Sequence, residues 1–195
     1  MRRICLLLAI AAAALASKPL SQGERDFAMS NLHASRKMFL DRVAGLSEAQ
    51  WRFKPAPDRW SIAECAEHIA LAEDFLFHLV TEKVMKSPPS PGKTPPSREE
   101  DETVIKRVGD RSQKFNAPDP LKPSGRWPDK DTLIPHFKAS RGRTISYVET
   151  STDDMRSHVL QDRDAYQWLL FISGHTERHV AQIDEVKADS NFPRD

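Results

Sequence analysis

In the stretch DAYQWLLFISGHTERHVAQIDEV, residues 164–186, one series of side chains recurs at alternating steps of four and three residues. That spacing matches the 3.6 residues per turn of an α-helix and predicts a helix from about Asp164 to Ala188. One stripe of this helix carries, in chain order, Trp168, Ile172, His175, His179, Gln182 and Val186. His175 and His179 therefore replace apolar residues on the face that should point into a helical core.

The same period recurs in other segments of the chain. It predicts helices over about 24–46, from Ser61 onward and over about 131–149, with a short amphipathic piece at 99–109. Ser61 is followed three residues later by Glu64, the pattern of a capping box at a helix start. Proline-rich residues 86–97 and 115–130 are predicted to be irregular connections within one domain, residues 24–188. The expected fold class is all-α, an up-and-down four-helix bundle with long Pro-rich loops.

Composition excludes several classes of protein. The 195 residues include 29 basic and 28 acidic side chains, so the sequence lacks the basic excess typical of a nucleic-acid binder. Seven glycines are few for a β-rich or dinucleotide-binding fold, which needs glycine at many turns. We therefore expect no nucleic-acid partner.

The N-terminus, MRRICLLLAIAAAALAS, has the order of a secretory signal peptide: two arginines, an apolar run and small residues at Ala14 and Ala16. We expect cleavage near Ala16, which removes residues 1–16 and exports the protein to the periplasm or medium. A permanent anchor is the alternative, but the run is shorter than the ~20 residues that span a bilayer. No stable membrane insertion is then expected after cleavage.

Cys65 is the one cysteine left after removal of residues 1–16, because Cys5 lies in the apolar run. An intramolecular disulfide is therefore impossible in the mature chain. We expect Cys65 to be buried and unreactive.

A third histidine shares the orientation of the first two. On the second predicted helix, steps of four and three residues lead from Ser61 through Cys65 to His68. His68 therefore lies on the inward stripe of that helix. Three imidazoles in one interior are costly to bury without partners, and a divalent metal is one such partner. The alternative is that each histidine hydrogen-bonds to a carbonyl or a carboxylate. His33, His78 and His136 lie at no ligand spacing and are expected to stay outside the site.

Three motifs resemble the DinB-like superfamily, whose members are regarded as metalloenzymes. They are GLSEAQWRFKPAPDRWSIAECAEHIALAED (45–74), NAPDPLKPSGRW (116–127) and the histidine-bearing stretch at 164–186. The resemblance covers about residues 24–188 and is most specific in W-S-x-x-E-x-x-x-H and H-x-x-x-H-x-x-Q. It implies a four-helix bundle with a three-histidine metal site, and the matching positions are His68, His175 and His179.

A three-histidine site leaves a coordination position open for water or a substrate, and imidazole suits zinc or nickel. The resemblance implies chemistry of the hydrolase or S-transferase type on an unknown small molecule. Glu177 lies about 200° round the helix from His175, so it cannot act as the glutamate of a zinc peptidase. Gln182 is either a partner of His179 or a polar core residue. The alternative function is a non-catalytic, metal-stabilised bundle that acts as a binding module, and a homodimer is left open.

Several aromatic side chains could line a pocket beside the metal, although at helical spacing such residues more often form plain core. They are Trp51, Trp60, Phe75, Trp168 and Phe171.

Overall fold

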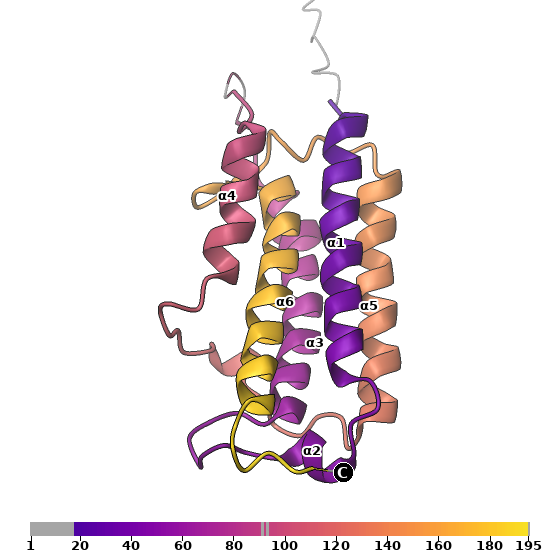
Figure 1. Ribbon diagram of the computed structural model, residues 1–195. Helices are drawn as coiled ribbons and strands as arrows, with labels where there is room; N and C mark the ends of the chain where they lie inside the picture. The colour runs from indigo at the N-terminus through magenta and orange to yellow at the C-terminus, as the bar shows by residue number, and fades with distance from the viewer. Residues whose placement is uncertain (1–17, 91, 93, 195) are drawn as a thin grey trace, which may run out of the picture.

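Four long helices run side by side in the computed structural model, which describes residues 18–90, 92 and 94–194 (Figure 1). They are α1 (Gln22–Val43), α3 (Ile62–Leu79), α5 (Lys130–Thr150) and α6 (Ala165–Lys187). The all-α prediction is confirmed, because the described chain is mostly helical. The predicted signal peptide, residues 1–16, lies outside the described residues.

Side-chain caps set the starts of these helices. Ser61 accepts a hydrogen bond from the Glu64 amide, and the Glu64 side chain accepts one from the Ser61 amide, which is the predicted capping box. Ser21 caps α1 in the same way. Asp164 caps α6 by accepting from the Gln167 amide. Each cap satisfies backbone amides that the first helical turn leaves unpaired.

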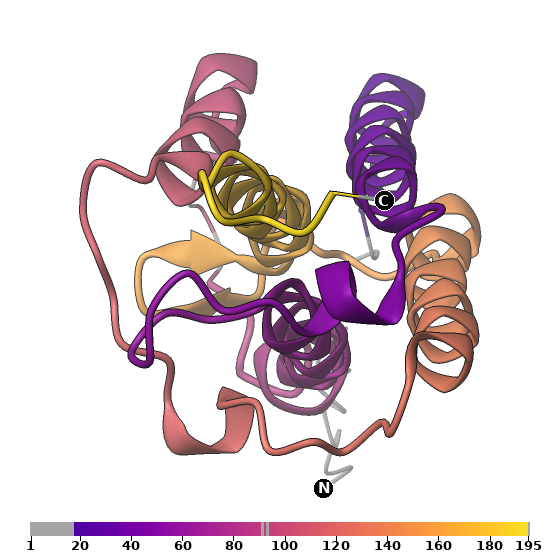
Figure 2. The same cartoon turned by 60° about the horizontal axis from the view of Figure 1, so that its bottom comes forward.

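The direction of the helices differs from the expected up-and-down order. Glu73 and Phe77 of α3 contact Arg141 and Tyr147 of α5, so α3 and α5 run in parallel. A parallel pair cannot be joined by a short turn, because the chain must first return to the other end. The return is made by α4 (Arg98–Gly109), which packs against α6, and by a long segment that curves around α3 on the side away from α1 (Figures 1 and 2).

Short elements complete the described fold. A five-residue helix, α2 (Glu48–Arg52), follows α1, and a π-helical turn, η1 (Val80–Val84), extends α3. A 3-10 turn, η2 (Asp119–Leu121), interrupts the segment between α4 and α5. The strands β1 (Val159–Leu160) and β2 (Arg163–Asp164) form an antiparallel hairpin before α6, with Val159 opposite Asp164. The sequence pattern did not predict α2, the π turn or the hairpin.

Apolar side chains fill the space between the long helices, and the most completely buried include Phe39, Phe137, Leu169 and Ile183. Cys65 is also fully buried, as predicted, and burial raises the pKa of its thiol. Among the helices of the described residues, none is both long and apolar enough to cross a membrane.

Candidate metal centre

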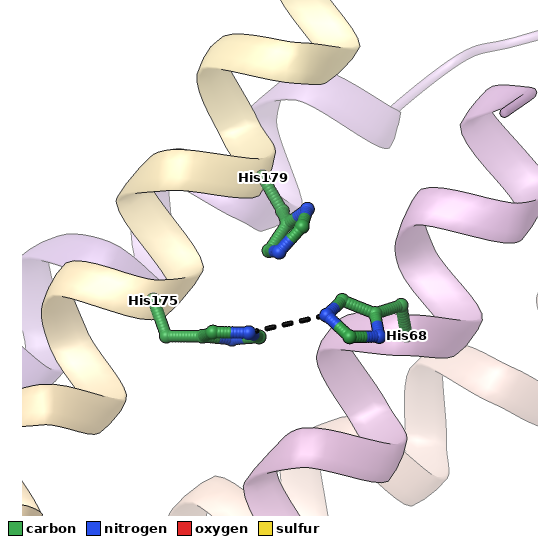
Figure 3. Close-up of side chains that lie close together, drawn as sticks. All are labelled: His68, His175 and His179. Atoms are coloured by element: carbon green, nitrogen blue, oxygen red, sulfur yellow. Dashed lines mark hydrogen bonds between the residues drawn. The ribbon is translucent and has the colours of Figure 1, made fainter. Parts of the chain in front are cut away.

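Three histidines from two helices converge between α3 and α6. His68 lies on α3, and His175 and His179 lie one turn apart on α6. One ring nitrogen from each lies within 4.8 Å of the others, and the Nε2 atoms of His68 and His175 are 3.1 Å apart (Figure 3). The structure thus brings together the three residues selected from the sequence.

This spacing fits the ligands of a single ion. Nitrogens bound to one zinc ion at tetrahedral angles are about 3.3 Å apart, because each Zn–N bond is about 2.0–2.1 Å long. The 3.1 Å between His68 and His175 is close to that value. The remaining separations between the ligand atoms are no more than 4.8 Å. Three imidazoles are also a donor set that zinc and nickel accept.

Hydrogen bonding fixes the tautomer of His68. Its Nδ1–H donates to the carbonyl of Leu121 at 2.7 Å, so Nε2 presents a lone pair toward the other histidines. The loop that follows Leu121 is held by the carboxylate of Glu67, which accepts from the backbone amides of Ser124, Gly125 and Arg126 at 2.9–3.0 Å. By holding this loop, Glu67 supports the position of the Leu121 carbonyl, which orients His68.

His179 is oriented from α6 itself. Its Nδ1–H donates to Oε1 of Gln182 at 2.9 Å, which leaves Nε2 free for a metal. Arg111 donates to the same oxygen at 3.4 Å, and Arg111 is in turn held by both carboxylate oxygens of Glu185. Arginine can only donate hydrogen bonds, so the Gln182 atom that lies between Arg111 and His179 must be the amide oxygen. Gln182 is thus a partner of His179. The sequence did not predict the contact between Arg111 and Gln182, because a position just after α4 does not indicate contact with α6.

The site favours neutral imidazoles. Removal from bulk water lowers the pKa of His68, and it lowers the pKa of His179 to about 3. The pKa of His175 falls well below its usual value, first through burial and then through the charges of His179 and His68. Neutral imidazole is the form that binds a metal, so protons compete weakly near neutral pH.

Aromatic rings stand beside the histidines. The ring of Trp60 lies 4.9 Å from that of His68, and the ring of Phe171 stacks at 6.1 Å on that of His175. His68 and His179 are buried, whereas His175 is partly exposed, so the cluster lies nearest to solvent on the His175 side. Of the other candidate pocket aromatics, Trp51 belongs to the core and Phe75 is exposed.

The other residues considered from the sequence lie outside the three-histidine cluster. Glu177 lies on the face of α6 that packs near Gly109 of α4, away from the three histidines. His33 and His78 are exposed. His136 contacts Asp74 at 2.7 Å and is not part of the cluster.

A second polar cluster holds the residue types of a serine hydrolase without their geometry. Ser140 donates directly to the carboxylate of Asp74 at 2.6 Å. The Nε2 of His136 faces both Asp74, at 2.7 Å, and the Ser140 hydroxyl, at 3.5 Å. A triad needs histidine between serine and aspartate, with one ring nitrogen for each. The cluster therefore joins α3 to α5 and does not have the geometry of a catalytic triad.

Comparison with known proteins agrees with the motifs. A model of the DinB superfamily matches residues 31–183, which include all three histidines. The uncharacterized protein YuaE of Bacillus subtilis (strain 168) is 24% identical over 164 residues, covering 82% of this chain and 96% of YuaE. No solved structure gives a significant match.

Proposed function

This chain belongs to the DinB superfamily, and from that premise we propose that it is an exported metal-dependent enzyme acting on a small molecule. His68, His175 and His179 would hold one divalent ion, with zinc or nickel the best match to three imidazoles. The proposed architecture is the four-helix bundle of the family, with α1, α3, α5 and α6 as its helices.

The convergence of three ring nitrogens within 4.8 Å of one another is the observation that carries this proposal. Two of the rings are already oriented by hydrogen bonds at Nδ1, to Leu121 and to Gln182. Preorganised ligands of this kind lower the cost of binding an ion. In the metal-free protein the Nε2 atoms of His68 and His175 share a hydrogen bond at 3.1 Å, and a bound ion would take the place of that bond.

An open coordination position supports catalysis over a purely structural site. In the described part of the chain, no fourth histidine, cysteine or carboxylate joins the group. A bound divalent ion supplies Lewis acidity, which polarises a carbonyl or lowers the pKa of a water or a thiol. The chain's own contribution is to hold the histidines neutral and fixed, with Trp60 packed against His68 and Phe171 stacked on His175.

We favour hydrolysis over S-transfer as the reaction of this enzyme. The signal-peptide pattern at residues 1–16 supports export after cleavage near Ala16, and an exported enzyme would not meet cytosolic thiol cofactors. Intact-mass analysis of the exported fraction tests this part of the proposal. A soluble cytosolic protein that retains residues 1–16 would contradict it.

Metal analysis of a matched set of variants tests the site. The wild-type protein should bind one ion per chain, and His68→Ala, His175→Ala or His179→Ala should each reduce metal content sharply. The controls His33→Ala, His78→Ala and His136→Ala should retain it, because these residues lie outside the cluster. Full stoichiometry and affinity in His68→Ala would show that α3 supplies no ligand and that the proposal is wrong.

A further inference from the structure

The candidate ligand set carries no negative charge. All three members are imidazoles, and no carboxylate of the described residues joins them. Metal binding requires these rings to be neutral, so the two positive charges of a bound ion would remain uncompensated by the protein ligands. A buried charge needs a partner of opposite sign.

Two nearby carboxylates are already committed elsewhere. Glu185 pairs with Arg111 at 2.6 Å and with Arg59 at 3.1 Å. Glu67 accepts from three backbone amides of the loop at 124–126. Neither carboxylate is free to neutralise an ion held by the histidines.

Arg178 adds a positive charge close enough to the histidines to contribute to the lowered pKa of His175 and His179. It directly precedes His179 on α6, and its guanidinium donates to the backbone carbonyls of Asp110 and Gln113. In the described chain no carboxylate forms an ion pair with Arg178, and Asp110 and Glu185 act on it only through longer-range attraction. A bound divalent ion together with Arg178 would therefore give this region a positive charge, which favours an anion.

One aromatic side chain lies against Arg178 and another lies against His175. Phe115 lies on the loop that Arg178 holds, with its ring 5.1 Å from the Arg178 guanidinium, and it is 72% exposed. Phe171 stacks on His175, the partly exposed histidine. A ligand that reaches the histidines from this side would meet aromatic rings as well as positive charge.

We propose that the metal centre takes a small organic anion with an apolar body. Its anionic head binds at the ion beside Arg178, and its body packs against Phe115 and Phe171. This inference rests on the proposed metal site and adds the class of ligand that the site selects.

Cobalt-loaded protein provides a test that does not depend on activity, because the visible spectrum of Co²⁺ responds to a change in its ligands. Three probes separate charge from apolar contact: hexanoate, acetate and the neutral hexanamide. Hexanoate and acetate should produce the same saturable spectral change, with hexanoate binding about tenfold tighter through its longer chain. Hexanamide should produce none.

Variants separate the contribution of charge to anion binding from that of apolar contact. Phe115→Ala should reduce the advantage of hexanoate over acetate to about threefold, whereas Met38→Ala, an exposed apolar residue on α1, should leave it unchanged. Arg178→Gln should weaken both anions about tenfold, and Arg178→Lys should recover most of that loss because it restores the charge. Circular dichroism of each variant checks that its total helix content is unchanged.

Equal binding of hexanamide and hexanoate would overturn the proposal, as would a stoichiometric Co²⁺ complex whose spectrum no anion changes. Those outcomes leave the metal site itself standing. Failure to bind Co²⁺ at all would overturn both the site and its ligand.

Discussion

Arg141 on α5 and Glu73 on α3 form an ion pair whose side chains are 0% and 1% exposed. The Nε of Arg141 donates to both carboxylate oxygens, and one terminal nitrogen donates to the nearer of them at 2.8 Å. The other donors reach the Leu32 carbonyl on α1 and the Thr176 hydroxyl on α6. One guanidinium thus connects all four long helices, beside the turn of α6 that carries His175.

Loss of one partner in this pair should destabilise the protein strongly. Arg141→Met leaves the Glu73 carboxylate buried without its cation, and we expect the free energy of unfolding to fall by about 3–5 kcal/mol. The double variant Glu73→Leu/Arg141→Met should recover much of the loss, because no charge remains buried. Urea unfolding measures both. The control is Lys37→Met, which removes an exposed pair with Asp41 and should cost less than about 1 kcal/mol. An equal effect of Arg141→Met and Lys37→Met would contradict the prediction.

Gln182 should control metal affinity without binding the metal. Gln182→Leu removes the acceptor of the His179 Nδ1–H, so the affinity for zinc should fall about tenfold or more. Gln182→Glu keeps an acceptor and should retain or increase affinity. Competition with a chromophoric chelator gives these values. Gln22→Leu, at an exposed position on α1, serves as the control. Unchanged affinity in Gln182→Leu would mean that the hydrogen bond does not orient His179.

Acid should destabilise the metal-free protein before most carboxylates titrate. The folded state keeps His68, His175 and His179 neutral below their usual pKa of 6.5, whereas the unfolded chain protonates them there. Their contribution to stability is therefore complete above pH 6.5 and is lost as the pH falls toward about 3, the pKa of His179. The slope approaches about 1.4 kcal/mol per pH unit for each histidine involved.

Asp164 acts in the opposite direction, because burial raises its pKa to about 6 and the folded state takes up a proton first. The measurement is therefore a comparison, in the presence of chelator, between wild type and His68→Gln/His179→Gln over pH 5.5–6.5. The variant should show the shallower loss of stability with acid. Parallel curves would exclude the histidines as the cause.

Gly174 should be intolerant of a side chain. A Cβ at this position would lie 2.6 Å from the Ile105 carbonyl oxygen of α4, so Gly174→Ala must push α4 away from α6. We expect a loss of about 1–3 kcal/mol in unfolding free energy. Gly142 lies inside α5 with open space around it, and Gly142→Ala should instead stabilise the protein by about 0.5–1 kcal/mol. Similar effects of the two substitutions would show that α4 does not pack closely on α6.

Local sequence determined the helices and the inward direction of the candidate ligands. Helical period and caps depend on neighbours within a few residues, so the starts at Ser61 and Asp164 could be read directly. The same period placed His68, His175 and His179 on inward stripes. The family motifs agreed with these positions because they lie on the same helices.

Tertiary structure alone decided which distant groups support those ligands and in which direction the helices run. The parallel pairing of α3 and α5 depends on where the long connection returns, and helical period carries no information about that. Arg111 reaches Gln182, and Leu121 reaches His68, only because loops distant in sequence close over α3 and α6. Hydrogen bonds between segments some 50–70 residues apart depend on the packing of the whole chain, whereas a helical stripe depends on one turn of backbone.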